Sequence, residues 1–168
     1  MTDISRMMHS AVPSRRLFLM AATALAACGP VAAADRFAAS PFRKLTAADW
    51  QKRLPGKSFT VLRQEDTEAP FSSPLNDEHH GGTFVCLGCG LPLFKSQWKF
   101  DSHTGWPSFY TAIAGALIKK SDFKIGIPRT EYHCAQCLGH QGHVFDDGPQ
   151  PTGLRYCNNG VALKFIPA

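Results

Sequence analysis

The sequence predicts a mainly β domain with a short helix near its N-terminus. Stretches rich in β-branched and aromatic residues occupy 58–63, 83–86 and 129–134, and Gly and Pro separate them, as is typical of short strands joined by turns. Two Cys-x-x-Cys pairs indicate a metal site that would hold distant segments together. A chain of 168 residues, 44% of them hydrophobic, has room for one such domain.

Residues 1–34 are typical of a twin-arginine export signal. Arg15 and Arg16 precede an apolar run over 17–27, and this run is shorter than the roughly 18 residues that a membrane-spanning helix requires. Cleavage after Ala34 would release a soluble protein, whereas acylation of Cys28 would produce a lipoprotein. The sequence therefore predicts a periplasmic protein, attached to a membrane only if that cysteine is lipidated.

A linker over 35–45 and a folded domain over 46–168 are expected after the signal. Residues 46–54 begin with an N-capping threonine and continue with good helix formers, which predicts the short helix. The prolines and glycines of residues 64–82 predict a long irregular connection.

A hairpin turn is expected at residues 158–160. The sequence Asn-Asn-Gly lies there between two strand-like stretches, and Asn and Gly tolerate the positive φ that a tight turn requires. Cys157 would then lie where a strand meets its turn.

The charge of the domain gives no reason to expect a nucleic-acid partner. The whole chain has a formal net charge of +5, but without residues 1–34 it holds 15 basic and 12 acidic residues, a net charge of +3. This excess is too small for a basic binding stripe. No internal repeat is present apart from the two cysteine pairs, and a monomer is expected.

The two cysteine pairs form a complete donor set for a structural zinc ion. Zn²⁺ prefers four thiolates in a tetrahedron, and each pair is followed by a glycine that favours a tight turn. Redox or disulfide chemistry is the alternative, because an exported protein enters an oxidising compartment. The predicted zinc ligands are Cys86, Cys89, Cys134 and Cys137.

Cys157 belongs to neither pair and is the candidate nucleophile. Its reactivity depends on neighbours that stabilise a thiolate, and Arg155, His140 and His143 are the candidates close in sequence. A protonated histidine would lower the pKa of the thiol and act as a general acid. The plain alternative is that the cysteine is a small buried hydrophobic residue.

The segment between the two pairs is dense in aromatic residues. Trp106, Phe109 and Tyr110 lie beside Gly and Pro, which predicts a fixed loop. Spacing alone leaves open whether these rings belong to the core or form the walls of a small apolar pocket.

The ordered set of motifs resembles the methionine-R-sulfoxide reductase B (MsrB) family, the peptide-methionine (R)-S-oxide reductases, over about residues 43–166. The matching segments are 67–71, both cysteine pairs, 99–109, 129–131, 143–149 and 151–159. The resemblance implies two antiparallel sheets, a β-tent with a zinc-ribbon-like clamp far from the chemistry.

The same resemblance assigns the site residues. It implies that Cys157 attacks the sulfoxide, that His140, His143 and Asn159 surround the sulfoxide oxygen, and that Trp106 receives the methyl group. Phe109 is expected as a second substrate-binding residue.

The implied function is thiol-dependent reduction of methionine R-sulfoxide, free or in proteins, through a sulfenic acid on Cys157. Many members carry a resolving cysteine where this chain has Thr104, so an external thiol, either a small molecule or a thioredoxin-like protein, is expected to regenerate the enzyme. Two alternatives are a zinc-ribbon binding module without catalysis and a thiol-disulfide oxidoreductase. The first gives no role to Cys157, and the second requires a cysteine pair to release its metal.

Overall fold

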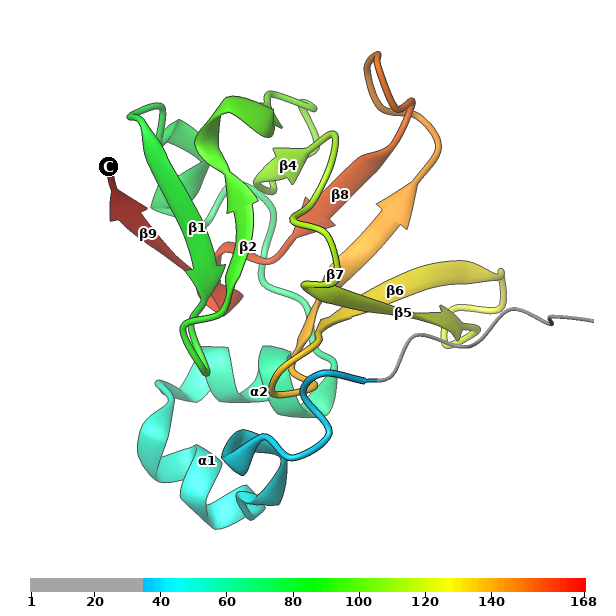
Figure 1. Cartoon of the computed structure of the whole chain (residues 1–168). Helices are drawn as coiled ribbons and strands as arrows, with labels where there is room; N and C mark the ends of the chain where they lie inside the picture. The colour runs from blue at the N-terminus through cyan, green and yellow to red at the C-terminus, as the bar shows by residue number, and fades with distance from the viewer. Residues whose placement is uncertain (1–34) are drawn as a thin grey trace, which may run out of the picture. The chain divides into compact units, whose positions relative to one another are not determined.

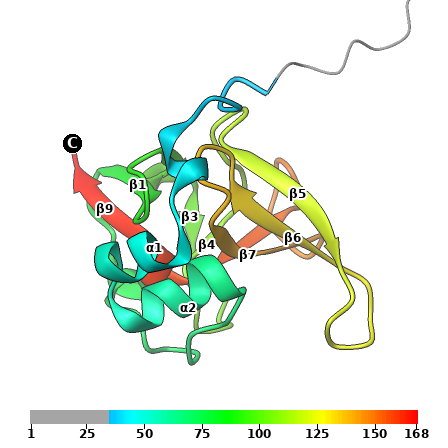
Figure 2. The same ribbon diagram turned by 90° about the horizontal axis from the view of Figure 1, so that it is seen from below.

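The computed structural model describes residues 35–168, which form two antiparallel β-sheets and two short helices (Figure 1). The three-stranded sheet has the order β2 (Pro92–Lys95), β1 (Gly82–Cys86), β9 (Leu163–Pro167). The six-stranded sheet has the order β3 (Lys99–Phe100), β4 (Ser108–Phe109), β8 (Arg155–Asn158), β7 (His140–Phe145), β6 (Arg129–Cys134), β5 (Leu117–Asp122). The helices α1 (Ala47–Arg53) and α2 (Gly56–Gln64) lie together at one end of the sheets (Figure 2). The predicted export signal, with both arginines and Cys28, lies outside the described residues.

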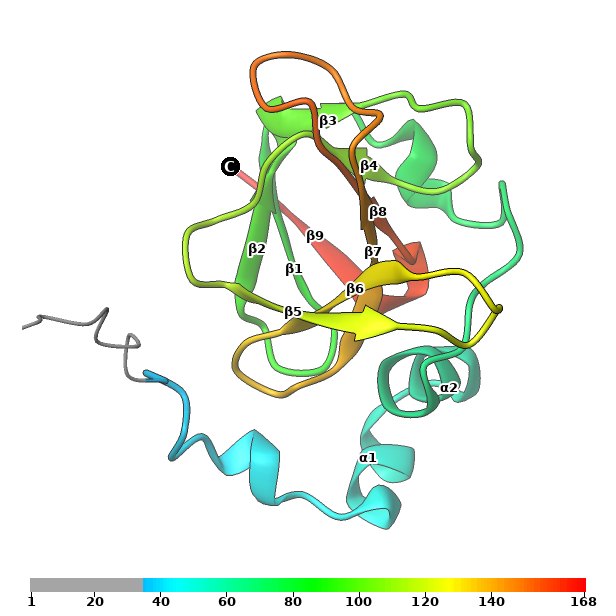
Figure 3. The same ribbon diagram turned by 90° about the vertical axis from the view of Figure 1, so that its right-hand side faces the viewer.

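The prediction of a mainly β fold with two antiparallel sheets is confirmed. β1 and β2 lie opposite β4, β8 and β7, so the inner faces of the two sheets enclose the core (Figure 3). Aromatic rings fill that space: Phe94 of β2 stacks on Phe109 of β4 with ring centroids 4.2 Å apart, and Phe84 of β1 meets Phe109 at 5.0 Å. Tyr132 and Tyr156 extend the same cluster along the six-stranded sheet. Burial of these large rings is the main force that joins the sheets.

The predicted first helix is present as α1. Thr46 caps it, since its hydroxyl accepts from the backbone N–H of Asp49 while the carboxylate of Asp49 accepts from the backbone N–H of Thr46. The helix buries Trp50, and the guanidinium of Arg63 from α2 lies 4.8 Å from the centre of its indole ring. These contacts fix the two helices against each other.

The expectation of a strand at residues 58–63 is wrong, because these residues belong to α2. The side chains of Ser58, Phe59, Val61 and Leu62 are buried, a spacing that forms one face of a helix. That face packs against β7 and the short 3-10 turn at Gly160–Ala162. Tertiary packing has therefore overridden the local β preference of Phe, Thr and Val.

The expected hairpin at residues 158–160 is also wrong. β8 and β9 lie in different sheets, and Asn159 has a negative φ of −67°. The chain crosses between the sheets here because the side chains of Asn158 and Asn159 bond to other parts of the fold. Cys157 consequently lies inside a strand, paired on both sides, and not at the mouth of a hairpin.

The other elements agree with the sequence more closely. The strands expected at 83–86 and 129–134 are β1 and β6, and residues 65–81 are irregular apart from a 3-10 turn at Pro74–Asp77. The segment expected as a linker is packed on the domain, since Phe42 stacks on Trp50 with ring centroids 6.3 Å apart. Within residues 35–168, no helix has the length and apolar character needed to cross a bilayer.

The close pairing of β7 and β8 depends on the glycine at position 142. A Cβ atom added to Gly142 would lie 1.9 Å from the carbonyl oxygen of Cys157, a backbone atom that cannot move without breaking the ladder. We expect Gly142→Ala to lower the free energy of unfolding by about 2 kcal/mol or more, as measured by urea denaturation.

The matched control is Gly81→Ala, where an added Cβ meets nothing within 4 Å. It should change stability by less than about 0.5 kcal/mol. Equal stability of the two variants would contradict the assigned register.

Candidate active site

Four cysteine sulfurs from the two sheets meet at one point. Sγ of Cys86 lies 3.6 Å from Sγ of Cys137, and Sγ of Cys89 lies 3.5 Å from Sγ of Cys134. All four sulfurs lie within 4.8 Å of one another, and no disulfide joins them. Sulfurs bound 2.3 Å from a tetrahedral Zn²⁺ are about 3.8 Å apart, so this donor set suits that ion. The structure therefore brings together all four predicted ligands as a group that could hold a metal.

A buried glutamine connects this cluster to the strand that carries Cys157. Nε2 of Gln141 donates to Sγ of Cys86 at 3.4 Å, and Oε1 of Gln141 accepts from Nδ2 of Asn158 at 3.4 Å. The carbonyl oxygen of Gln141 also accepts from both the backbone and the side-chain nitrogen of Asn159, at 2.8 and 3.0 Å. The two residues that follow Cys157 are thus fixed by the same residue that contacts the cluster.

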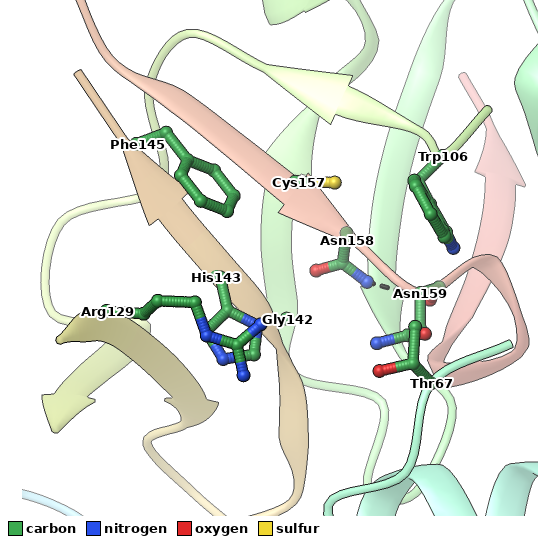
Figure 4. Close-up of a pocket in the computed structure, with 9 residues that line it drawn as sticks. All are labelled: Thr67, Trp106, Arg129, Gly142, His143, Phe145, Cys157, Asn158 and Asn159. Atoms are coloured by element: carbon green, nitrogen blue, oxygen red, sulfur yellow. Dashed lines mark hydrogen bonds between the residues drawn. The ribbon is translucent and has the colours of Figure 1, made fainter. Parts of the chain in front are cut away.

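Cys157 opens into a pocket of about 120 Å³. Its sulfur points toward the side where Trp106 lies, and His143 and Arg129 form the opposite side (Figure 4). Cys157 and His143 are directly paired across β8 and β7, so their side chains emerge on the same face of the sheet. The pocket is lined by Thr67, Trp106, Arg129, Gly142, His143, Phe145, Cys157, Asn158 and Asn159.

Burial governs the acidity of the thiol. It raises the pKa of Cys157 above its ordinary value, while the nearby Arg155 guanidinium and the Thr104 hydroxyl act in the opposite direction. The guanidinium of Arg155 is held by two 2.8 Å bonds to the carboxylate of Asp147. Much of its charge is therefore compensated, and the thiol is the favoured form of this cysteine in the free protein.

His143 is oriented by an aspartate that the sequence analysis missed. Nε2 of His143 lies 2.8 Å from Oδ2 of Asp122, which also accepts from the guanidinium of Arg129. Hydrogen bonds from the backbone N–H of Lys124 and from these two side chains hold the pKa of Asp122 well below its usual range. Because a carboxylate only accepts, the neutral ring of His143 carries its proton on Nε2 and leaves Nδ1 as a base.

Both predicted histidines are held in their neutral forms. Burial lowers the pKa of His143 below its ordinary value, against the opposing influence of Asp122, and lowers the pKa of His140 to about 4. A resting imidazolium that stabilises a thiolate, as the sequence analysis expected, is therefore disfavoured. The physical reason is that both rings lie in a poorly solvated part of the sheet.

His140 does not line the pocket. It is 1% exposed, and its ring lies between those of His143 and His133, with centroids 5.5 Å from each. It lies outside the pocket and packs against His143, the histidine that is paired with Cys157.

Asn159 lines the pocket, but both ends of its amide are already engaged. Nδ2 donates to Gln141, and Oδ1 accepts from the backbone N–H of Glu68 at 2.9 Å. The carbonyl oxygen of Glu68 in turn accepts from Nε1 of Trp106 at 3.2 Å. Asn159 thereby sets the position of the segment on which the tryptophan ring rests.

Phe109 belongs to the core and not to the pocket. Its ring is fully buried and stacks on Phe94, so its position gives no contact with a ligand in the pocket. Of the pocket residues that the sequence analysis did not single out, Thr67, Arg129 and Phe145 lie in motifs already quoted. Asp122, which lies behind the pocket, carried no signal of its own, because it reaches His143 only through strand pairing.

Comparison with known proteins identifies the family. A family model described as the SelR domain matches residues 54–167. The peptide methionine sulfoxide reductase MsrB of Pseudomonas putida (strain W619) is 50% identical over 123 residues, which are 73% of this chain and 92% of that protein. MsrB of Leptospira interrogans is 48% identical over 118 residues, covering 70% and 90%, and MsrB of Bradyrhizobium diazoefficiens is 50% identical over 119 residues, covering 70% and 86%. The chain therefore belongs to the MsrB family.

Proposed function

We propose that this protein is a peptide-methionine (R)-S-oxide reductase, which reduces methionine R-sulfoxide to methionine with a thiol as reductant. The observation that carries the proposal is the placement of Cys157. It is the one cysteine of residues 35–168 outside the four-sulfur cluster, and its sulfur lies in a pocket between an indole ring and an aspartate-oriented histidine. Membership of the MsrB family supports the same activity.

The first step of the reaction balances with Cys157 and the sulfoxide substrate alone. Sγ of Cys157 attacks the substrate, the sulfur–oxygen bond of the sulfoxide breaks, and the oxygen remains on the cysteine as a sulfenic acid. The substrate sulfur is reduced to the thioether, the cysteine is oxidised, and the thiol proton ends on the transferred oxygen.

His143 carries that proton in our proposal. A neutral imidazole beside a thiol of raised pKa accepts the proton from Sγ as attack begins and returns it to the oxygen as the bond breaks. The carboxylate of Asp122, 2.8 Å from Nε2, stabilises the imidazolium that forms for a moment. His140 and Asn159 act as positioning residues, the first behind His143 and the second beneath Trp106.

Within the pocket, the apolar ring of Trp106 lies across from the polar side chains of His143 and Arg129, which supports selection of a single epimer. Trp106 receives the methyl group, and the side that holds His143 and Arg129 receives the oxygen. A chiral sulfoxide fits such a pocket in one configuration only.

The four-cysteine cluster holds a structural zinc ion in this proposal. Tetrahedral thiolate sites of this kind leave no coordination position open, so the ion contributes to folding and takes no part in the reaction. A thiol-disulfide oxidoreductase is less well supported, because the cluster cysteines would have to leave the metal. A zinc-ribbon binding module without catalysis gives no role to the pocket.

The regenerating thiol comes from outside the domain. Among residues 35–168, the other four cysteines all belong to the cluster, so none is free to resolve the sulfenic acid on Cys157. A small thiol or a thioredoxin-like protein supplies the reducing equivalents. The twin-arginine pattern of residues 1–34 supports export to the periplasm, with lipidation of Cys28 as the alternative route of processing.

Two cysteine variants separate catalysis from metal binding. We expect Cys157→Ser to abolish reduction of a methionine R-sulfoxide substrate with dithiothreitol, because a hydroxyl is a poor nucleophile toward sulfur, while zinc content and stability stay unchanged. Cys86→Ser should lose zinc and destabilise the fold together. Wild-type turnover by Cys157→Ser would refute the assignment of the nucleophile.

Replacement of Asp122, the aspartate that binds His143, should change the pH dependence of kcat/KM. Asp122 raises the pKa of His143, so Asp122→Asn lowers it further, and the neutral base persists to lower pH. We expect the acid limb of kcat/KM to move to lower pH, while kcat falls by roughly 10-fold to 100-fold because the imidazolium loses its partner.

NMR titration of the histidine rings measures the pKa of His143, and rates measured across a pH series locate the acid limb of kcat/KM. Asp101→Asn is the control, since Asp101 pairs with the exposed His103. An acid limb that stays in place in Asp122→Asn would remove His143 from the proton transfer.

A resolving cysteine should be restorable. The hydroxyl of Thr104 is near enough to lower the pKa of the Cys157 thiol, so Thr104→Cys places a second thiol near the sulfenic acid. We expect a disulfide after one turnover without reductant, with release of water and loss of two thiols per methionine formed.

Wild-type protein treated in the same way should keep a sulfenic acid that dimedone traps. Thr83→Cys, in the three-stranded sheet, should behave like wild type. A Thr104→Cys protein that remains fully trappable would contradict the placement of this loop.

A further inference from the structure

A second group of metal-binding side chains lies on β6 and β7, apart from the four sulfurs. Glu131 and His133 are two residues apart on β6 and so share a face of the sheet, and His140 of β7 is paired directly with His133. Nε2 of His133 lies 3.4 Å from Oε1 of Glu131, and Nδ1 of His140 lies 3.1 Å from Oε2. One ligand atom from each of the three residues falls within 4.8 Å of the others.

These imidazoles lack the hydrogen bonds that buried polar atoms normally make. Within residues 35–168, neither ring nitrogen of His140 makes a hydrogen bond, although the side chain is only 1% exposed: Nδ1 is close to Glu131, but the contact lacks hydrogen-bond geometry. Nε2 of His133 also makes none there. Buried donors and acceptors left in this way cost free energy unless something else satisfies them. Both rings face the same carboxylate.

The ring of His133 is already set in the form that binds a metal. Its Nδ1 lies 3.1 Å from the carbonyl oxygen of Leu138, and because a carbonyl only accepts, this nitrogen carries the proton. On the neutral ring, Nε2 then carries a lone pair and lies 3.4 Å from a carboxylate oxygen with which it makes no hydrogen bond. A lone pair and a carboxylate oxygen this close repel each other unless a cation lies near both. A hydrogen bond from the remote ring nitrogen to a backbone carbonyl is the usual support of a metal-bound histidine.

The spacing of the donors also suits a small ion. Nitrogen and oxygen ligands bound at 2.0–2.2 Å lie about 2.8–3.6 Å apart in octahedral or tetrahedral geometry, and both nitrogen–oxygen separations in this group fall in that range. Two imidazoles and one carboxylate favour Zn²⁺, Cu²⁺ or Ni²⁺ over Ca²⁺ and Mg²⁺, which prefer oxygen alone.

One cation already lies at the edge of this group. Nζ of Lys120 is 2.8 Å from Oε1 of Glu131, and it competes with a metal for the carboxylate. The same nitrogen lies 3.2 Å from Glu65, so it has a second partner when Glu131 turns to a metal. The side chain of Lys120 is 57% exposed, and its movement opens a way in from the solvent.

We propose that Glu131, His133 and His140 form a binding site for one divalent transition-metal ion, separate from the four-cysteine cluster. The site goes beyond the reductase activity and does not depend on it. The histidine at 133 supplies the ligand that turns a buried Glu–His contact into a three-donor site.

The test uses the full chain with its cysteine cluster filled by zinc, titrated with Co²⁺ as a probe. Cobalt bound by nitrogen and oxygen gives visible d–d bands without the intense near-ultraviolet thiolate-to-metal band, so binding here is distinguished from exchange into the cysteine cluster. We expect one additional equivalent of Co²⁺ per chain, and at least a 10-fold weaker affinity in His133→Ala.

Two further variants keep the test decisive if His133→Ala is destabilised. Lys120→Ala should bind Co²⁺ more tightly than wild type, because it removes the competing ammonium, and a misfolded protein would not gain affinity. His80→Ala, which alters an exposed histidine that also pairs with a carboxylate, should bind as wild type does. Absence of a second equivalent, unchanged binding in His133→Ala, or loss of binding in His80→Ala would overturn the proposal.

Discussion

The convergence of four sulfurs at one point is the constraint on which the rest of the structure depends. Cys86 ends β1 in the small sheet and Cys134 ends β6 in the large sheet, and Cys89 and Cys137 lie in the turns that follow. A metal held by all four would fasten the two sheets at the end where the helices lie, where α2 adds a bond from Arg63 to the carbonyl oxygen of Cys137. The cluster thus joins the two sheets at this end, and the aromatic side chains pack in the space between them.

From this end of the sheets, buried hydrogen bonds link the four-cysteine cluster to the strand that carries Cys157. Gln141 bonds to Cys86 on one side and to Asn158 and Asn159 on the other, and the hydroxyl of Tyr132 donates to Oδ1 of Asn158 at 2.9 Å. Each of these groups is buried, so an unmade bond would leave a polar atom without water as a substitute. The four-cysteine cluster thereby helps to fix the strand that carries Cys157, the nucleophile of the proposed reaction.

The sequence was informative where chemistry depends on residue type and spacing, and less so where it depends on strand pairing. The cysteine pairs, Cys157 and the first helix could be predicted because their signals are local. Asp122 could not, since it lies 21 residues before His143 and reaches it only through the pairing of β5, β6 and β7. The turn at 158–160 was misjudged for a related reason: its asparagines serve tertiary hydrogen bonds, which outweigh their preference for a tight turn.

The same burial that raises the pKa of Cys157 lowers the pKa of His143, and the two shifts act together. In water, the charged thiolate and imidazolium would be better solvated than in this pocket, and each group would exchange its proton with the solvent. In this pocket both neutral forms are favoured, so the proton stays on sulfur until a substrate arrives. Asp122 then offsets part of the cost of charge on the ring. In the proposed reaction, protection of the thiol between turnovers and its activation during attack would have one physical origin, the exclusion of water from the face shared by β7 and β8.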